Sequence, residues 1–94
     1  MAITVKFIGA FRSISGKSKI SIRTKDSVSL SEVIKQVIEE QPKIKRALID
    51  PELEDPRPNT LILINGKEIS ILNGLDTTVK NGDEVVLVPV VHGG

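Results

Sequence analysis

The chain has 94 residues and contains no cysteine, no tryptophan and no tyrosine, with two phenylalanines and one histidine. Without cysteine it can form no disulfide, thiol nucleophile, thiolate metal site or persulfide of its own. The single histidine, His92, cannot build a metal site without carboxylate ligands. We therefore predict no metal, and any sulfur chemistry must use an atom other than a cysteine sulfur.

The charge is nearly balanced, with 13 basic and 12 acidic side chains and a net charge of +1. Nucleic-acid binders usually combine a basic excess with aromatic stacking residues, so we predict no direct nucleic-acid contact. No apolar run reaches the roughly 18 residues that a membrane-spanning helix needs. The first residues also lack the pattern of a signal peptide. We expect a cytoplasmic protein without a membrane partner.

The apolar residues that are present favour strands. The chain has 13 isoleucines, and β-branched residues are enriched in sheets. Residues 2–8 and 18–24 each alternate apolar and polar side chains, a period typical of half-buried strands. Residues 13–17 between them are rich in serine and glycine, which predicts a hairpin. The side chains predicted to face the core are Ile3, Val5, Phe7, Ile20 and Ile22.

The next segment has the period of an amphipathic helix. Ser29 and Glu32 have the spacing of a capping box at its start. Pro42 disfavours continuation of the helix beyond that point. The stripe predicted to face the core consists of Leu30, Val33, Ile34, Val37 and Ile38.

The second half of the chain predicts a short helix over 43–49, then an exposed proline-rich loop. The apolar run 61–64, followed by Asn65-Gly66, predicts a central strand and a tight turn. A short strand over 68–71 and a last strand over 84–90 complete the order. The loop prolines are Pro51, Pro56 and Pro58.

One main helix is too little to cover both faces of a sheet. We therefore predict an α+β fold in which a single helix packs across one face of a mixed four- to five-stranded sheet. The first and last strands are expected side by side at its centre. This domain would span 1–90, and 91–94 would form a flexible tail.

The tail reads Val91-His92-Gly93-Gly94, directly after a β-branched strand. Glycines lack a Cβ and allow the walls of a narrow channel to approach from both sides. An extended segment from Pro89 to Gly94 reaches roughly 20 Å. Once adenylated, a terminal carboxylate can accept sulfur or be attacked by a lysine amine. The alternative is a frayed chain end without a role.

The fold order and the tail together resemble the ubiquitin-like β-grasp sulfur carriers. This group includes the ubiquitin-related modifiers, the archaeal small modifiers and the small subunit of molybdopterin synthase. The resemblance covers almost the whole chain. The motifs that carry it are Val5-Lys6-Phe7 with Phe11-Arg12 and Gly16, Leu72-x-Gly74-Leu75-Asp76, Val79-x-x-Gly82-Asp83-Glu84-Val85, and Pro89-x-x-x-Gly93-Gly94.

The resemblance implies a carrier that is not an enzyme and has no catalytic residue or bound cofactor. An E1-like adenylating enzyme would use ATP to activate Gly94, which would hold the acyl-adenylate and then the thiocarboxylate. Gly93 and His92 would give clearance in the partner's channel. The further partners implied are a sulfur donor protein and either a sulfur-accepting enzyme or the lysines of target proteins.

Phe11 and Arg12 fall where a partner-facing patch is expected, although Phe11 could instead anchor the core and Arg12 could be a solvated charge. The His-Gly-Gly ending and a single preceding Pro89 are more similar to the ubiquitin-related modifiers, which favours tRNA thiolation and protein conjugation. The molybdopterin synthase subunit is the alternative. Two further alternatives are a β-grasp interaction domain that is not activated and a regulatory subunit that inserts its tail into a partner.

Overall fold

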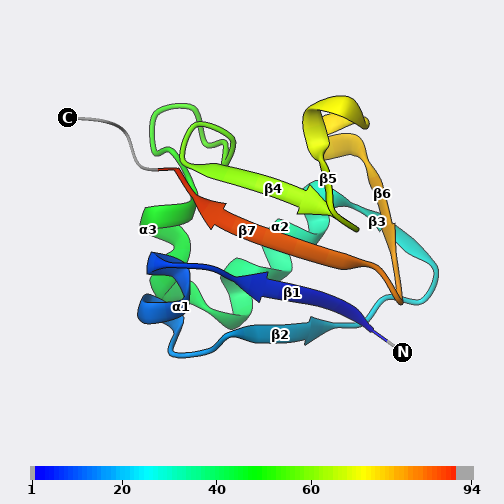
Figure 1. Cartoon of the computed structure of the whole chain (residues 1–94), viewed down its shortest axis with the longest axis horizontal. Coiled ribbons are helices and arrows are strands. Elements are labelled where there is room, and N and C mark those ends of the chain that lie inside the picture. The colour runs from blue at the N-terminus through cyan, green and yellow to red at the C-terminus, as the bar shows by residue number, and fades with distance from the viewer. Residues whose placement is uncertain (1, 91–94) are drawn as a thin grey trace.

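The first and last strands of the described chain lie side by side in the middle of one sheet (Figure 1). The computed structural model describes residues 2–90. Within them, five strands occur in the order β2-β1-β7-β4-β5, and the first and last strands are parallel neighbours, as predicted. The fold is therefore a mixed-sheet α+β fold. Its strands are β1 (Ile3–Phe7), β2 (Lys19–Ile22), β4 (Thr60–Ile64), β5 (Lys67–Glu68) and β7 (Glu84–Pro89).

The main helix, α2 (Leu30–Glu40), lies across one face of this sheet (Figure 1). The Ser29 hydroxyl accepts a 3.2 Å hydrogen bond from the Glu32 amide, which confirms the serine half of the predicted capping box. The return bond from the Ser29 amide to the Glu32 carboxylate is not formed in the described structure. The helix ends before Pro42, which begins a 3₁₀ turn. Four of the five predicted stripe residues are buried and Ile38 is partly buried against the core. The capped amphipathic helix thus closes the inner face of the sheet.

The remaining elements are short. Two further helices are α1 (Ala10–Ser15) and α3 (Lys45–Leu48), and the 3₁₀ turns are η1 (Pro42–Ile44), η2 (Ile69–Ile71) and η3 (Gly74–Asp76). A second, two-stranded sheet joins β3 (Ser27–Ser29) to β6 (Thr78–Lys80). None of the helices within 2–90 has the length and apolar character to cross a membrane.

Four local expectations differ from the structure. The segment 13–17 is not a simple turn, because α1 occupies most of the connection between β1 and β2. Pro56 is buried within the loop that was expected to be exposed. The return strand is shorter than 68–71, since the chain turns into η2 after Glu68. The sheet of β3 and β6 was not predicted, because its strands have only three residues each.

Candidate functional site: an apolar sheet face at the end of the last strand

The face of the sheet opposite α2 carries a cluster of apolar side chains beside the end of β7. Leu61 pairs with Val88, and Leu63 pairs with Val86, so all four residues project from the same side of two neighbouring strands. Leu61 is 38% exposed and the other three are partly buried, whereas the residues that alternate with them are buried, apart from Pro89 at the end of β7. We call these four residues the apolar face.

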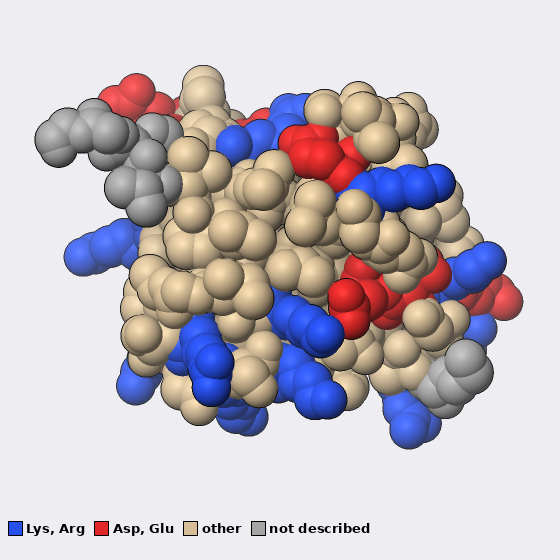
Figure 2. Space-filling model, in the orientation of Figure 1, with Lys and Arg blue, Asp and Glu red and all other residues tan. Residues whose placement is uncertain are grey.

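Two exposed residues extend the apolar face to the point where the described chain ends. Ile8 follows β1 and is 43% exposed, and Val90 follows β7 and is 42% exposed. Figure 2 views this side of the molecule, and uncharged atoms cover its middle while lysine and arginine side chains gather along the β2 edge. Contiguous apolar patches on soluble domains are often interaction sites, so this face is the candidate docking surface.

A charged pair closes the other end of the apolar face. The Lys6 ammonium lies 3.0 Å from the Glu84 carboxylate, and the two side chains are 44% and 42% exposed. Lys6, on β1, lies directly beside Val86 of the parallel strand β7. Exposed ion pairs contribute little to stability. The charges of Lys6 and Glu84 mark the boundary of the apolar face near the start of β7.

The structure separates the two residues of the predicted surface patch. Phe11 is 0% exposed and belongs to the hydrophobic core, so its assignment to a partner surface is corrected and its alternative role as a core aromatic holds. The reason is that α1 turns this side chain inward beneath the sheet. Arg12, the next residue on α1, is exposed and remains available to a partner. The predicted sites at His92, Gly93 and Gly94 lie outside the described residues.

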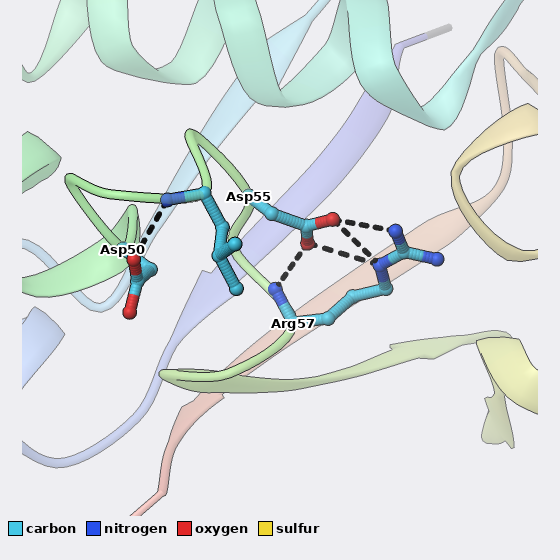
Figure 3. Close-up of polar contacts among 4 residues, drawn as sticks. Asp50, Asp55 and Arg57 are labelled. Atoms are coloured by element: carbon cyan, nitrogen blue, oxygen red, sulfur yellow. Dashed lines mark hydrogen bonds and ion pairs between the residues drawn. The ribbon is translucent and has the colours of Figure 1, made fainter.

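The loop that leads into β4 is held by its own polar groups (Figure 3). The amide of Asp50 donates to the carbonyl of Asp55 at 2.9 Å, and the amide of Glu54 donates to the carbonyl of Asp50 at 2.7 Å. The Asp55 carboxylate accepts from the Arg57 backbone amide at 2.8 Å and from its guanidinium at 2.9 Å. The guanidinium bond lowers the pKa of Asp55 and raises the pKa of Arg57. These hydrogen bonds order the 50–57 loop, which lies beside the end of β7.

Within 2–90, no group of three or more His, Asp or Glu side chains is arranged to hold a metal ion. The structure also places no buried, unpaired polar side chain among these residues.

The sheet, its single covering helix and the exposed face beside the last strand define a ubiquitin-like β-grasp protein. The family model described as the ThiS family matches residues 5–94. The chain belongs to this family. Its members are small ubiquitin-like modifiers and sulfur carriers and are not themselves enzymes.

Individual relatives agree with this assignment. The chain is 29% identical to small archaeal modifier protein 3 of Haloferax volcanii over 94 residues, covering all of both chains. It is 28% identical to ubiquitin-related modifier 1 of Schizosaccharomyces pombe over 100 residues, again covering all of both. The crystal structure of SAMP1 from Haloferax volcanii superposes with a TM-score of 0.84, at 16% identity and full coverage of both chains. That likeness shows the shared fold.

The sequence prediction did not identify the apolar face, although the sequence contains a signal for it. The runs 61–64 and 85–88 are apolar at both inward and outward positions. In a fold with one main helix, only one face of the sheet is covered, so the outward half of such runs must remain exposed. When a sheet is covered by helices on one face only, a strand with apolar residues at both its inward and its outward positions therefore predicts a docking face.

Proposed function

We propose that this protein is a carrier whose Gly94 carboxylate is activated by an E1-like adenylating enzyme and then receives sulfur or is transferred to a lysine. The observation that carries the proposal is the position of the apolar face, which borders Val90 at the end of the central strand β7. A partner that covers this face would meet the residues that follow Val90 at the edge of the same interface. The family assignment supports the same function.

The chemistry uses the partner's nucleotide site. The carboxylate attacks the α-phosphorus of ATP, forming an acyl-adenylate and releasing pyrophosphate. Attack by hydrosulfide-level sulfur on the acyl carbon gives a thiocarboxylate and releases AMP. Attack by a lysine amine gives an isopeptide and also releases AMP. The carrier contributes docking and reach rather than a reacting side chain, and the sulfur would serve tRNA thiolation while the isopeptide would tag proteins in the cytoplasm.

Arg12 and the basic β2 edge would contribute to association with the partner. With a net charge of +1, the whole molecule has a weak field, so long-range attraction is small. The partner is therefore expected to bind mainly through apolar contact with the face, with a few charged contacts at its rim. Rim charges of this kind act on the association rate and on its salt dependence.

The test uses the intact mass of the protein. Purified protein is incubated with host lysate, ATP and a sulfide source, and we expect replacement of one terminal oxygen by sulfur only when ATP is present. Deleting Gly94 shortens the chain by roughly 3.3 Å, and adding an alanine after it lengthens the chain by a similar amount. A displacement of about 1 Å in a reacting group can cost on the order of 100-fold in rate, so both variants should lose the thiocarboxylate.

Both length variants leave the core of 2–90 unchanged and should melt like the parent. A non-activated interaction domain predicts the reverse, with partner binding and cellular function retained in both variants. Full function of the Gly94 deletion would end the carrier proposal. Conjugates are measured separately, by mass spectrometry of target proteins for a lysine-linked Gly-Gly remnant.

A further inference from the structure

We propose that Gly9, Pro89 and Asn59 form a clamp that fixes where, and in which direction, the residues after Val90 leave the domain. The inference rests on the activation of Gly94 proposed above and deepens it, because it names the residues that position this carboxylate. The clamp holds the last described residues from two sides. One side is the turn after β1, and the other is the end of the 50–57 loop.

On the first side, a glycine allows the ring of Pro89 to lie against the backbone of the turn. Gly9 has φ 56° and ψ −126°, a conformation that L side chains rarely adopt. A Cβ at Gly9 would lie 3.3 Å from Cγ and 3.7 Å from Cδ of Pro89. The amide of the preceding Ile8 donates to the carbonyl of Leu87 at 3.1 Å. The positive φ of the turn therefore favours glycine at position 9, and a Cβ there would make the Pro89 ring shift by a few tenths of an ångström.

On the second side, the amide of Val90 donates to the carbonyl of Asn59 at 2.9 Å. Pro89 lies opposite Thr60, so this bond continues the pairing of β4 with β7 by one residue. The Asn59 carbonyl is itself fixed, because its amide donates to the carbonyl of Pro56 at 3.0 Å, and Pro56 is buried. The ordered 50–57 loop thus supports the bond that holds Val90.

The clamp sets the working length of the tail. With Val90 held, the four residues 91–94 can reach roughly 13 Å at about 3.3 Å per residue. The partner's nucleotide site must then lie within that distance of the apolar face. Loosening the clamp leaves the docking face intact but spreads the positions that the carboxylate visits. We therefore expect an effect on the rate of adenylation of bound carrier and not on carrier binding.

The first test needs no partner. Hydrogen–deuterium exchange at the Val90 amide is measured by NMR in the whole protein and in a peptide of residues 88–94. A held amide exchanges at least about tenfold more slowly in the protein than in the peptide. Equal rates in the two molecules would overturn the clamp, whatever the activity of the protein.

The second test uses ATP–pyrophosphate exchange driven by the adenylating activity of the host lysate. Pro89→Ala removes the ring that a Cβ at position 9 would meet. An ester in place of the Val90 amide, introduced by protein semisynthesis, removes the donor to Asn59 while keeping the valine side chain on the apolar face. We expect kcat to fall by about 10- to 100-fold for both, with KM for the carrier within about twofold of the parent. Pro42→Ala, at an exposed proline of η1 outside the 50–57 loop, is the matched control and should keep both constants.

The outcomes separate the two proposals. Suppose that the parent chain supports ATP–pyrophosphate exchange. If both clamp variants then keep the kcat of the parent, or change only KM, the clamp is wrong while the proposed function stands. If the parent chain supports no exchange, the proposed function fails, and the amide measurement alone decides whether the clamp exists. Thermal melts of all variants confirm that they are folded under the conditions used.

Discussion

Leu61 lies directly opposite Val88 on the uncovered side of the sheet, and Ile62 and Leu87, their neighbours on the covered side, are buried. A cross-strand apolar pair that faces solvent adds little to the core, and polar residues at these positions would be more soluble. The pair is therefore better explained by a partner that covers it. This relationship makes the outer face of the sheet the first target for mutagenesis.

Leu61→Glu should weaken binding of the adenylating partner at least about tenfold, because a charge in the middle of an apolar interface is desolvated without a counter-charge. Leu61 is 38% exposed, so the free energy of unfolding should change by less than about 1 kcal/mol. Binding is measured by titration calorimetry with the purified partner.

The matched control is Ile71→Glu, which introduces the same charge at an apolar residue that is 72% exposed in η2, away from the apolar face. This variant should bind like the parent. Equal losses of affinity in the two variants would show that net charge, and not the apolar face, governs binding.

Arg12→Glu should slow association with the partner at low salt and change the free energy of unfolding by no more than about 0.5 kcal/mol. Its exposed position on α1 makes a structural effect small. Lys25→Glu changes the net charge equally at another exposed position and serves as the control. Stopped-flow association rates at two salt concentrations distinguish the variants, and identical rates for both would remove Arg12 from the interface.

Val37→Asp should destabilise the protein by more than about 3 kcal/mol, because Val37 is 0% exposed and the new carboxylate would be buried without a partner. Lys35→Asp, on the exposed side of the same helix, should cost no more than about 0.5 kcal/mol. Urea denaturation measures both. A Val37→Asp protein as stable as the Lys35→Asp protein would contradict the packing of α2 on the sheet.

Asp55→Asn should lower the melting temperature at neutral pH and have a smaller effect in acid. The hydrogen bond from Arg57 lowers the pKa of Asp55 below the ordinary aspartate value of 3.8. The stabilisation by the ionised carboxylate is therefore present above that value and is lost as the pH falls through the lower, folded-state pKa. Melts from about pH 7 to about pH 2 should show the two proteins converging. Asp26→Asn, at an exposed acid in another loop, is the control.

Local patterns in the sequence predicted the elements whose residues are periodic. The alternation in 2–8 and 18–24 and the stripe of α2 correspond to β1, β2 and the covering helix. The N-cap at Ser29 could also be predicted from the sequence, because its hydrogen bond joins residues only three apart. Short elements such as β3 and β6 escaped prediction, since three residues carry too little periodicity to distinguish a strand from a loop.

By itself, the sequence determined the fold class, the adjacency of the first and last strands, and the motifs of the resemblance. Only the tertiary structure decided that Phe11 is buried and Arg12 exposed, that Leu61 and Val88 share an uncovered face, and that Gly9 and Asn59 meet the end of β7. The physical reason is that periodicity tells which side chains share a face. Whether that face is covered, and which distant backbone contacts it, depends on the packing of segments far apart in the chain.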